Sequence, residues 1–206
     1  QLLCVDTGYS CYRDELLNCL RKEFPDFDSR SKAVLLTHAD SDHCGLLDLF
    51  DNTYLSRKCF LNFEREHSGQ KSFREQNPLH APFVRISNIF SQYSPPDLSK
   101  LRIIGGSDAK IHALIQKTAV FRFDTLNFEV YEGCGGHVEG ELVFIDRAHK
   151  ILFTGDLFVN IKGFSPEQAA FNRLAPYLMT SVDTAPELAA KERESIFALL
   201  DPGEWI

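Results

Sequence analysis

Short apolar runs and a helical repeat mark the first part of the chain. Residues 2–5 and 33–36 are unbroken apolar runs with the length of a buried strand, and polar residues follow each. Between them, over 11–24, apolar side chains recur at intervals of three and four, the period of a helix with one buried face (Leu16, Leu17, Leu20 and Phe24). Ser10 is a candidate N-cap, and Pro25 ends the pattern. The order strand, helix, strand predicts two parallel strands joined by a crossover helix.

The second half of the chain has the patterns of further strands and of C-terminal helices. The predicted strands are 121–123, 126–131, 142–145 and 151–154. The first two alternate apolar and polar residues with period two, and the last two predict a hairpin. Helices are expected to begin near 165–167 and near 184–186, the second of them stopping before Pro202.

One segment, 57–100, interrupts both patterns. Its periodicity fades, it is polar with scattered aromatic residues, and proline recurs in it. Its charged part, 57–74, mixes both signs, which is typical of a solvated face. We therefore expect one α/β domain over 1–206, in which 57–100 forms an inserted lobe or lid.

Composition limits the classes of function. The chain has 206 residues, of which 44% are apolar and 25% charged, as in a soluble folded domain. The 22 basic and 29 acidic residues give a net charge of −7, which disfavours nucleic acid as a partner. No apolar run approaches the roughly 18–20 residues that cross a bilayer. Six cysteines without a Cys-x-x-Cys pair indicate reduced thiols and a cytoplasmic location. The expected partner is a small-molecule substrate, and the oligomeric state stays open.

Four side chains of the kinds that bind metals stand within six positions, directly after the second apolar run. They are His38, Asp40, Asp42 and His43. Imidazole nitrogens and carboxylate oxygens together suit zinc, iron or manganese, and alternating positions in a turn direct several of them into one pocket. The alternative is that Asp42 or Ser41 caps a helix that starts near His43, with both histidines in a solvated loop. Capping requires one such residue and not four, so the cluster favours a metal site.

Two later residues extend this set. His137 stands among glycines directly after a predicted strand, where the backbone can approach a metal closely. Asp156 stands at the end of the predicted hairpin. Each alone is equally well explained as a loop histidine or a turn aspartate, but their order after the first cluster favours metal ligands. The other histidines are expected on the surface: His67, His80, His112 and His149.

In these motifs the chain resembles the metallo-β-lactamase-fold hydrolases. The resemblance rests on Asp6-Thr7-Gly8 after the first strand, His-x-Asp-x-Asp-His at 38–43, Gly136-His137 and Gly155-Asp156. It covers nearly the whole chain in order and spacing. It implies an αββα sandwich, here trimmed at both ends, with the metal site on loops at one edge of the two sheets.

The resemblance also implies a role for each residue. Two divalent transition-metal ions, zinc first and iron or manganese as alternatives, would bind here. One would be held by His38, Asp40 and His137, the other by Asp42 and His43, with Asp156 between them. The implied activity is hydrolysis by a metal-bound hydroxide of an ester, thioester, lactone, amide or phosphodiester. Asp42 is the catalytic candidate that orients the hydroxide, Asp6 orients the ligand loops from behind, and Asn160 and Lys162 are candidates for substrate binding.

Two departures from the family pattern keep other functions open. Asp40 stands where the family commonly has histidine, which is closer to the flavodiiron subgroup and leaves a di-iron oxidoreductase as an alternative. No histidine follows His149, although the family has a last metal histidine some tens of residues after the bridging aspartate. We expect that ligand beyond Ile206. A non-catalytic metal-binding domain is the alternative if the ligand is absent.

Overall fold

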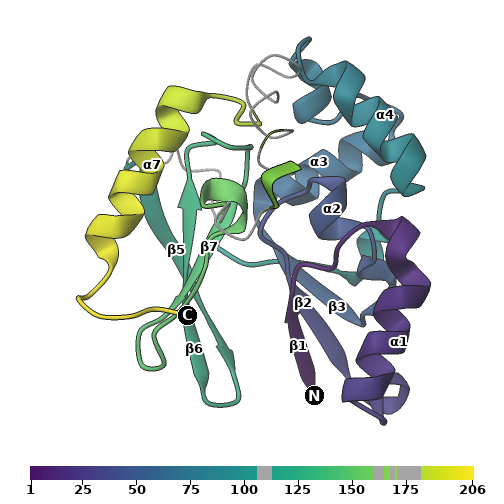
Figure 1. The fold of residues 1–206 in the computed structure, drawn as a ribbon, viewed down its shortest axis with the longest axis horizontal. Helices are drawn as coiled ribbons and strands as arrows, with labels where there is room; N and C mark the ends of the chain where they lie inside the picture. The colour runs from purple at the N-terminus through teal and green to yellow at the C-terminus, as the bar shows by residue number, and fades with distance from the viewer. Residues whose placement is uncertain (106–112, 160–164, 168–169, 171–181) are drawn as a thin grey trace.

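The strands of the computed structural model, which describes residues 1–105, 113–159, 165–167, 170 and 182–206, form two four-stranded sheets in these residues (Figure 1). Neighbouring strands of the first sheet are all parallel: β1 (Leu2–Val5), β2 (Lys32–Leu35), β3 (Asn52–Leu55) and β4 (Leu101–Ile103). Those of the second sheet are all antiparallel: β5 (Ile115–Phe123), β6 (Leu126–Gly133), β7 (Leu142–Asp146) and β8 (Ile151–Phe153).

Helices cover the outer sides of the two sheets (Figure 1). The helices whose bounds the structure gives are α1 (Arg13–Glu23), α2 (Ser41–Cys44), α3 (Arg57–His67), α4 (Ala81–Ser91) and α7 (Pro186–Leu199). Figure 1 places α7 outside the second sheet and α1 and α3 on the side of the first. The layers are therefore helix, sheet, sheet, helix, as the resemblance implied.

Alternating side chains on the strands explain this layering. Between the sheets, Leu35 of β2 belongs to one buried cluster with Phe144 of β7. The preceding residues of the same strands, Val34 and Val143, point to the opposite faces. Val34 packs with the residues under α3, and Val143 packs with Ile196 of α7. Each sheet thus buries both of its faces, and a helix is required to cover the outer one.

The local predictions for the first strands are confirmed, and the predicted helix cap is wrong. β1 and β2 pair in parallel, and α1 connects them. Ser10 does not cap α1, because its hydroxyl donates a hydrogen bond to the carbonyl oxygen of Gly45 at 2.8 Å. A short 3-10 turn, Ser10–Tyr12, leads into the helix instead. The hydroxyl of Ser10 therefore binds an acceptor that is distant in the sequence, the carbonyl oxygen of Gly45, instead of the end of α1.

The rest of the chain follows the patterns less evenly. The predicted hairpin is observed as β7 and β8, and the last helix is observed as α7. The patterns did not predict β3, β4, α3 or α4; both of these helices lie in 57–100, where the periodicity fades. Most of the helix expected from 165–167 lies outside the described residues. None of the described helices is both long and apolar enough to cross a membrane.

The sheet topology brings the candidate residues to one edge. β1 and β2 are parallel, so Asp6 and His38, which follow them, lie at the same end of the first sheet. β6 and β8 are both antiparallel to β7, so their carboxyl ends, which lead to His137 and Asp156, share one end of the second sheet. The two ends meet, because the rings of His38 and His137 lie 5.1 Å apart between centroids.

Candidate metal centre

His38 lies at the centre of the candidate site. It is fully buried, and its ring centroid lies 4.0 Å from that of His43. Its Nδ1 is hydrogen-bonded to Oγ1 of Thr37 at 3.0 Å, and its Nε2 lies 3.5 Å from Oδ2 of Asp40. Among the described residues this Nε2 has no hydrogen-bond partner. Buried polar atoms are rarely left unpaired, so this nitrogen fits the role of a metal ligand.

Asp156 connects the histidines on either side of His38. Its Oδ1 lies 3.2 Å from Nε2 of His43, and its Oδ2 lies 3.8 Å from Nε2 of His137. Oδ2 of Asp40 lies 3.7 Å from the same nitrogen of His137. In the described part of the chain, two groups of ligand atoms are close enough to hold an ion: His38, Asp40 and His137, and His38, His43 and Asp156. The donor set, imidazole with carboxylate, is one that zinc, iron or manganese accepts.

Asp42 lies at the rim of this cluster and belongs to neither group. Its Oδ2 is 3.7 Å from Nε2 of His43, and its side chain is 39% exposed. Asp42 does not cap α2, because the N-cap position is occupied by Asp40. The side chain of Asp40 makes no cap hydrogen bond either. The carboxylate of Asp42 is therefore free to face the adjoining pocket, which it lines.

Asp6 supports His43 from behind. Its Oδ2 lies 2.8 Å from Nδ1 of His43, and its carboxylate also accepts hydrogen bonds from the backbone N–H and the hydroxyl of Thr37, at 2.8 and 2.7 Å. The φ angle of Asp6 is 58°, a value that is uncommon for residues other than glycine. These contacts compensate for the backbone conformation and direct Nε2 of His43 towards Asp156.

A carboxylate that the sequence analysis missed supports His137 in the same way. Oδ1 of Asp183 lies 3.0 Å from Nδ1 of His137, and its Oδ2 accepts a hydrogen bond from Arg193 at 2.8 Å. A carboxylate on one ring nitrogen fixes the orientation of a metal-binding histidine and leaves the other nitrogen for the metal. Asp183 lies 46 positions after His137, without a motif around it, so no sequence signal pointed to it.

The loop that carries His137 is fixed by α7. Glu192 of α7 is buried, and its carboxylate accepts hydrogen bonds from the backbone N–H groups of Cys134 and Gly136. A Cβ atom at Gly136 would collide with this carboxylate and with the backbone nitrogen of Ala189. Glycine is required there because the helix approaches the loop so closely.

Replacing Glu192 by alanine is expected to reduce the free energy of unfolding by about 3 kcal/mol, because the buried N–H group of Gly136 and the part-buried N–H group of Cys134 lose their acceptors. Urea denaturation of the metal-free protein measures this change. Glu194→Ala, on the exposed side of the same helix, is the control and should change stability by less than about 0.5 kcal/mol. Equal stability of both variants would contradict the anchoring role of Glu192.

The charges of the site shift its pKa values. Burial lowers the pKa of His43, but the hydrogen bonds to Asp156 and Asp6 outweigh burial and raise it to about 11. Burial raises the pKa of Asp156, but the hydrogen bond and the charge of His43 outweigh burial and lower it to about 2. Without metal, His43 is therefore protonated and Asp156 ionised at neutral pH.

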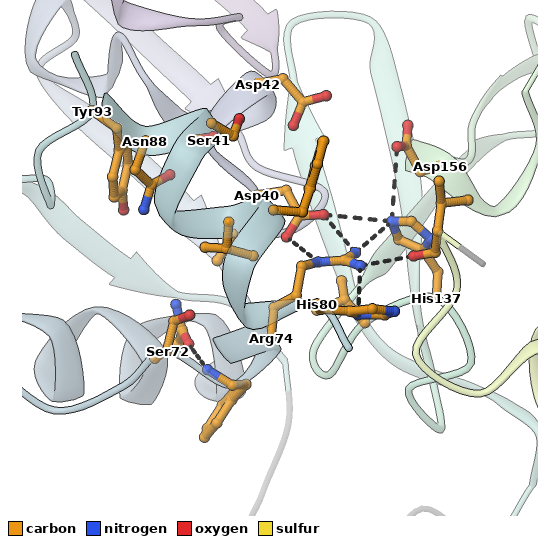
Figure 2. Close-up of a pocket in the computed structure, with 18 of the residues that line it drawn as sticks. Asp40, Ser41, Asp42, Ser72, Arg74, His80, Asn88, Tyr93, His137 and Asp156 are labelled. Atoms are coloured by element: carbon orange, nitrogen blue, oxygen red, sulfur yellow. Dashed lines mark hydrogen bonds and ion pairs between the residues drawn. The ribbon is translucent and has the colours of Figure 1, made fainter. Parts of the chain in front are cut away.

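Arg74 is the residue whose place the sequence patterns predicted wrongly. It lies in the charged stretch that was expected to be a solvated face, but its side chain is 12% exposed and its guanidinium contacts Asp40 (Figure 2). His80, expected on the surface, is also buried. Three residues named in the sequence analysis lie outside the described residues: Asn160, Lys162 and His112.

An open pocket of about 180 Å³ adjoins the cluster. It extends from His137 and Asp156 past Arg74 to Glu66 and Tyr93, and most of its wall comes from the segment 57–100. The Tyr93 hydroxyl donates a hydrogen bond to Glu66 at 2.8 Å, while Phe73 and Phe83 add apolar surface. The pocket has the mixed lining of a small-molecule site.

Comparison with known proteins identifies the fold. No protein-family model matches the chain, and no curated protein matches its sequence. A metallo-β-lactamase family protein from Thermus thermophilus matches with a TM-score of 0.52 and 20% identity, over 96% of this chain and 74% of that one. A subclass B3 metallo-β-lactamase from a soil metagenome library, MEM-A1, gives 0.54 and 17%, over 98% and 67%. The dizinc quorum-quenching lactonase AidC gives 0.51 and 18%, over 95% and 63%.

The chain therefore has the metallo-β-lactamase fold, as its motifs predicted. It spans between 63% and 74% of the lengths of these three solved chains. Identities this low define the fold, and one fold serves many substrates, so the activity has to be argued from the site.

Proposed function

We propose that this protein is a metal-dependent hydrolase that binds about two divalent transition-metal ions. The observation that carries the proposal is the pair of adjoining ligand groups that share His38 and open onto a pocket. The unpaired, buried Nε2 of His38 supports it. The fold is shared with proteins described as a dizinc lactonase and a metallo-β-lactamase, which favours zinc and hydrolysis.

The side chains divide the work of binding and orientation. His38, Asp40 and His137 would hold one ion and His43 and Asp42 the other, and the two oxygens of Asp156 are placed to serve both. Bound metal ions lower the pKa of water and polarise the carbonyl or phosphoryl oxygen of a substrate. Asp6 and Asp183 hold Nδ1 of His43 and of His137, which leaves Nε2 of each ring for an ion. Asp42, at the pocket rim, would orient the attacking water and accept its proton.

The alternative of a di-iron oxidoreductase rested on the extra negative charge of Asp40. In the structure that charge is paired with the guanidinium of Arg74 at 2.6 Å. This ion pair belongs to the metal-free site. Hydrolysis is the better-supported function because the fold is shared with the dizinc lactonase and the metallo-β-lactamase.

Metal counting by mass spectrometry, on protein purified without chelators, tests the proposal. We expect about two zinc ions per chain. We also expect cleavage of at least one of a lactone, a thioester, a β-lactam or a phosphodiester, and this activity should be lost when a chelator removes the metal. Iron with oxygen consumption would favour the oxidoreductase. Bound metal without turnover would favour a non-catalytic domain. Protein that takes up no metal would exclude the metal centre.

Asp42→Ala is expected to lower kcat by about 10²–10⁴-fold, because a positioned acid–base group contributes that much. The fold should persist, since the side chain is 39% exposed. The kcat is measured with whichever of the four substrate classes above the wild type cleaves fastest, and circular dichroism checks that the variant is folded. Asp14→Ala, on the exposed face of α1, is the control. Wild-type kcat in Asp42→Ala would remove this residue from the mechanism.

A further inference from the structure

Arg74 brings a permanent positive charge into one of the two ligand groups. Its Nε donates a hydrogen bond to Oδ1 of Asp40 at 2.8 Å, and its Nη2 lies 2.6 Å from Oδ2 of the same carboxylate. Nη2 also lies 3.1 Å from Nε2 of His137 (Figure 2). The guanidinium thus faces two of the three ligands in the group formed by His38, Asp40 and His137.

The atoms that Arg74 occupies are those that a metal ion in this group would need. Arginine has donors only and stays charged, so it cannot itself be a ligand. Nε2 of His137 has a single lone pair, and this lone pair accepts from Arg74 the hydrogen bond that an ion would have to displace. Oδ2 of Asp40 faces the same guanidinium at 2.6 Å. A guanidinium and a divalent cation in contact with the same two side chains would also repel each other. Arg74 and a metal ion at this position are therefore mutually exclusive.

The second ligand group is not engaged by Arg74. Nε2 of His38 is unpaired among the described residues, and His38 forms a group with His43 and Asp156 as well as with Asp40 and His137. An ion can therefore bind at His38, His43 and Asp156 while Arg74 remains in contact with Asp40.

We propose that Arg74 is an internal cation that competes with metal for the group of His38, Asp40 and His137. The group of His38, His43 and Asp156 fills first, and a second ion binds at Asp40 and His137 only when Arg74 withdraws from Asp40. Since the one free nitrogen of His38 serves a single ion, His38 would then pass to this second ion, and Asp42 would take its place beside His43 and Asp156. The backbone carbonyl of Val182, which accepts from Nη1 at 2.7 Å, holds the side chain in its competing position. The proposal rests on the proposed function, because it requires that the site binds metal.

Zinc titration of the metal-stripped protein, in competition with a chromophoric chelator, tests this competition. The wild type should bind one ion tightly and a second at least about 10-fold more weakly, because of the adjacent charge. Arg74→Met keeps the length of the side chain without its charge and should bind the second ion at least about 10-fold more tightly than the wild type. Arg74→Lys, which keeps the charge but loses the two-pronged contact, should lie between them.

A matched control is available on α1. Arg21 pairs with Asp28 through the same two nitrogens, Nε at 2.9 Å and Nη2 at 3.1 Å, but on the surface. Arg21→Met therefore removes an equivalent ion pair away from the site, and its two zinc affinities should equal those of the wild type.

Thermal unfolding provides a readout that does not depend on activity. Metal-free Arg74→Met should have a lower Tm than the wild type, because Asp40 loses its partner, and a larger rise in Tm on adding zinc. A folded Arg74→Met that binds the second ion no more tightly than the wild type overturns the proposal. If that variant is unfolded without metal, Arg74→Lys decides, and wild-type affinity for the second ion then overturns it. Failure of the wild type and all variants to bind zinc would instead overturn the metal centre itself.

Discussion

Exchange of Asp156 for asparagine is expected to lower the affinity for zinc at least about 100-fold. Loss of a residue that only supports a ligand costs up to about 100-fold, and loss of a ligand itself should cost at least as much. In the proposed metal centre Asp156 would serve both ions, because its two oxygens face Nε2 of His43 and Nε2 of His137. Asparagine keeps the shape but loses the charge and one acceptor oxygen. Zinc titration and metal counting after dialysis measure the loss.

The fold of Asp156→Asn should be retained, since the backbone N–H of residue 156 still donates to Oε1 of Glu141. Asp124→Asn is the matched control, because Asp124 is exposed in the β5–β6 turn with φ of 51°, a conformation that asparagine tolerates. The assignment of Asp156 to both metal positions would be wrong if the variant kept two ions with the affinity of the wild type.

Zinc affinity is also expected to fall as pH falls, by about 10-fold per pH unit for each proton that the ion displaces. His43 holds a proton in the metal-free protein, because its pKa is raised to about 11. Its Nε2 must lose that proton to bind an ion. Between pH 8 and pH 6 the affinity should therefore fall about 100-fold or more.

Calorimetry in two buffers of different ionisation enthalpy at pH 7 counts the protons released. At least about one proton per first ion is expected. A binding enthalpy independent of the buffer would show that no proton is displaced and that His43 is not a ligand of the first ion.

The stability of the metal-free protein should depend on pH in the opposite direction from the zinc affinity: it should fall as pH rises. The pKa of His43 is about 11 in the folded state and about 6.5 in the unfolded state. Its contribution to stability is complete below pH 6.5, falls as pH rises above that value, and is lost above about pH 11. Urea denaturation at pH 7 and at pH 9.5 should show lower stability at the higher pH.

The cluster of candidate ligands could be predicted from the sequence, because its members lie at the ends of recognisable strands. His38 follows an apolar run, His137 follows an alternating one, and Asp156 follows a predicted hairpin. The carboxyl ends of such strands converge at one edge, so local patterns were enough to predict a cluster. Asp42 was predicted as a ligand by its place in the motif, and this stays a prediction: its Oδ2 lies 3.7 Å from Nε2 of His43, at the rim of the cluster.

The two helices of the segment 57–100, α3 and α4, were not predicted because they bury polar residues. α3 buries Asn62 beside Cys59 and Phe63, which breaks the apolar repeat that identifies a helix. In α4, Ile89 and Phe90 are largely exposed, while Ser91 is buried. Hydrophobic periodicity reports which face of a helix is buried only when that face is apolar, and here the buried faces include polar side chains such as Asn62 and Ser91.

The sequence by itself determined the parallel pairing of β1 and β2, the candidate metal ligands and, through the resemblance that they carry, the class of fold. Only the tertiary structure decided which groups contact those candidate ligands. Arg74 meets Asp40 across 34 positions, and Asp183 meets His137 across 46. A single arginine or aspartate has no periodicity and no motif, and its charge acts over a few ångströms in space whatever the separation along the chain. Its role is therefore set by the fold that brings its partner to it.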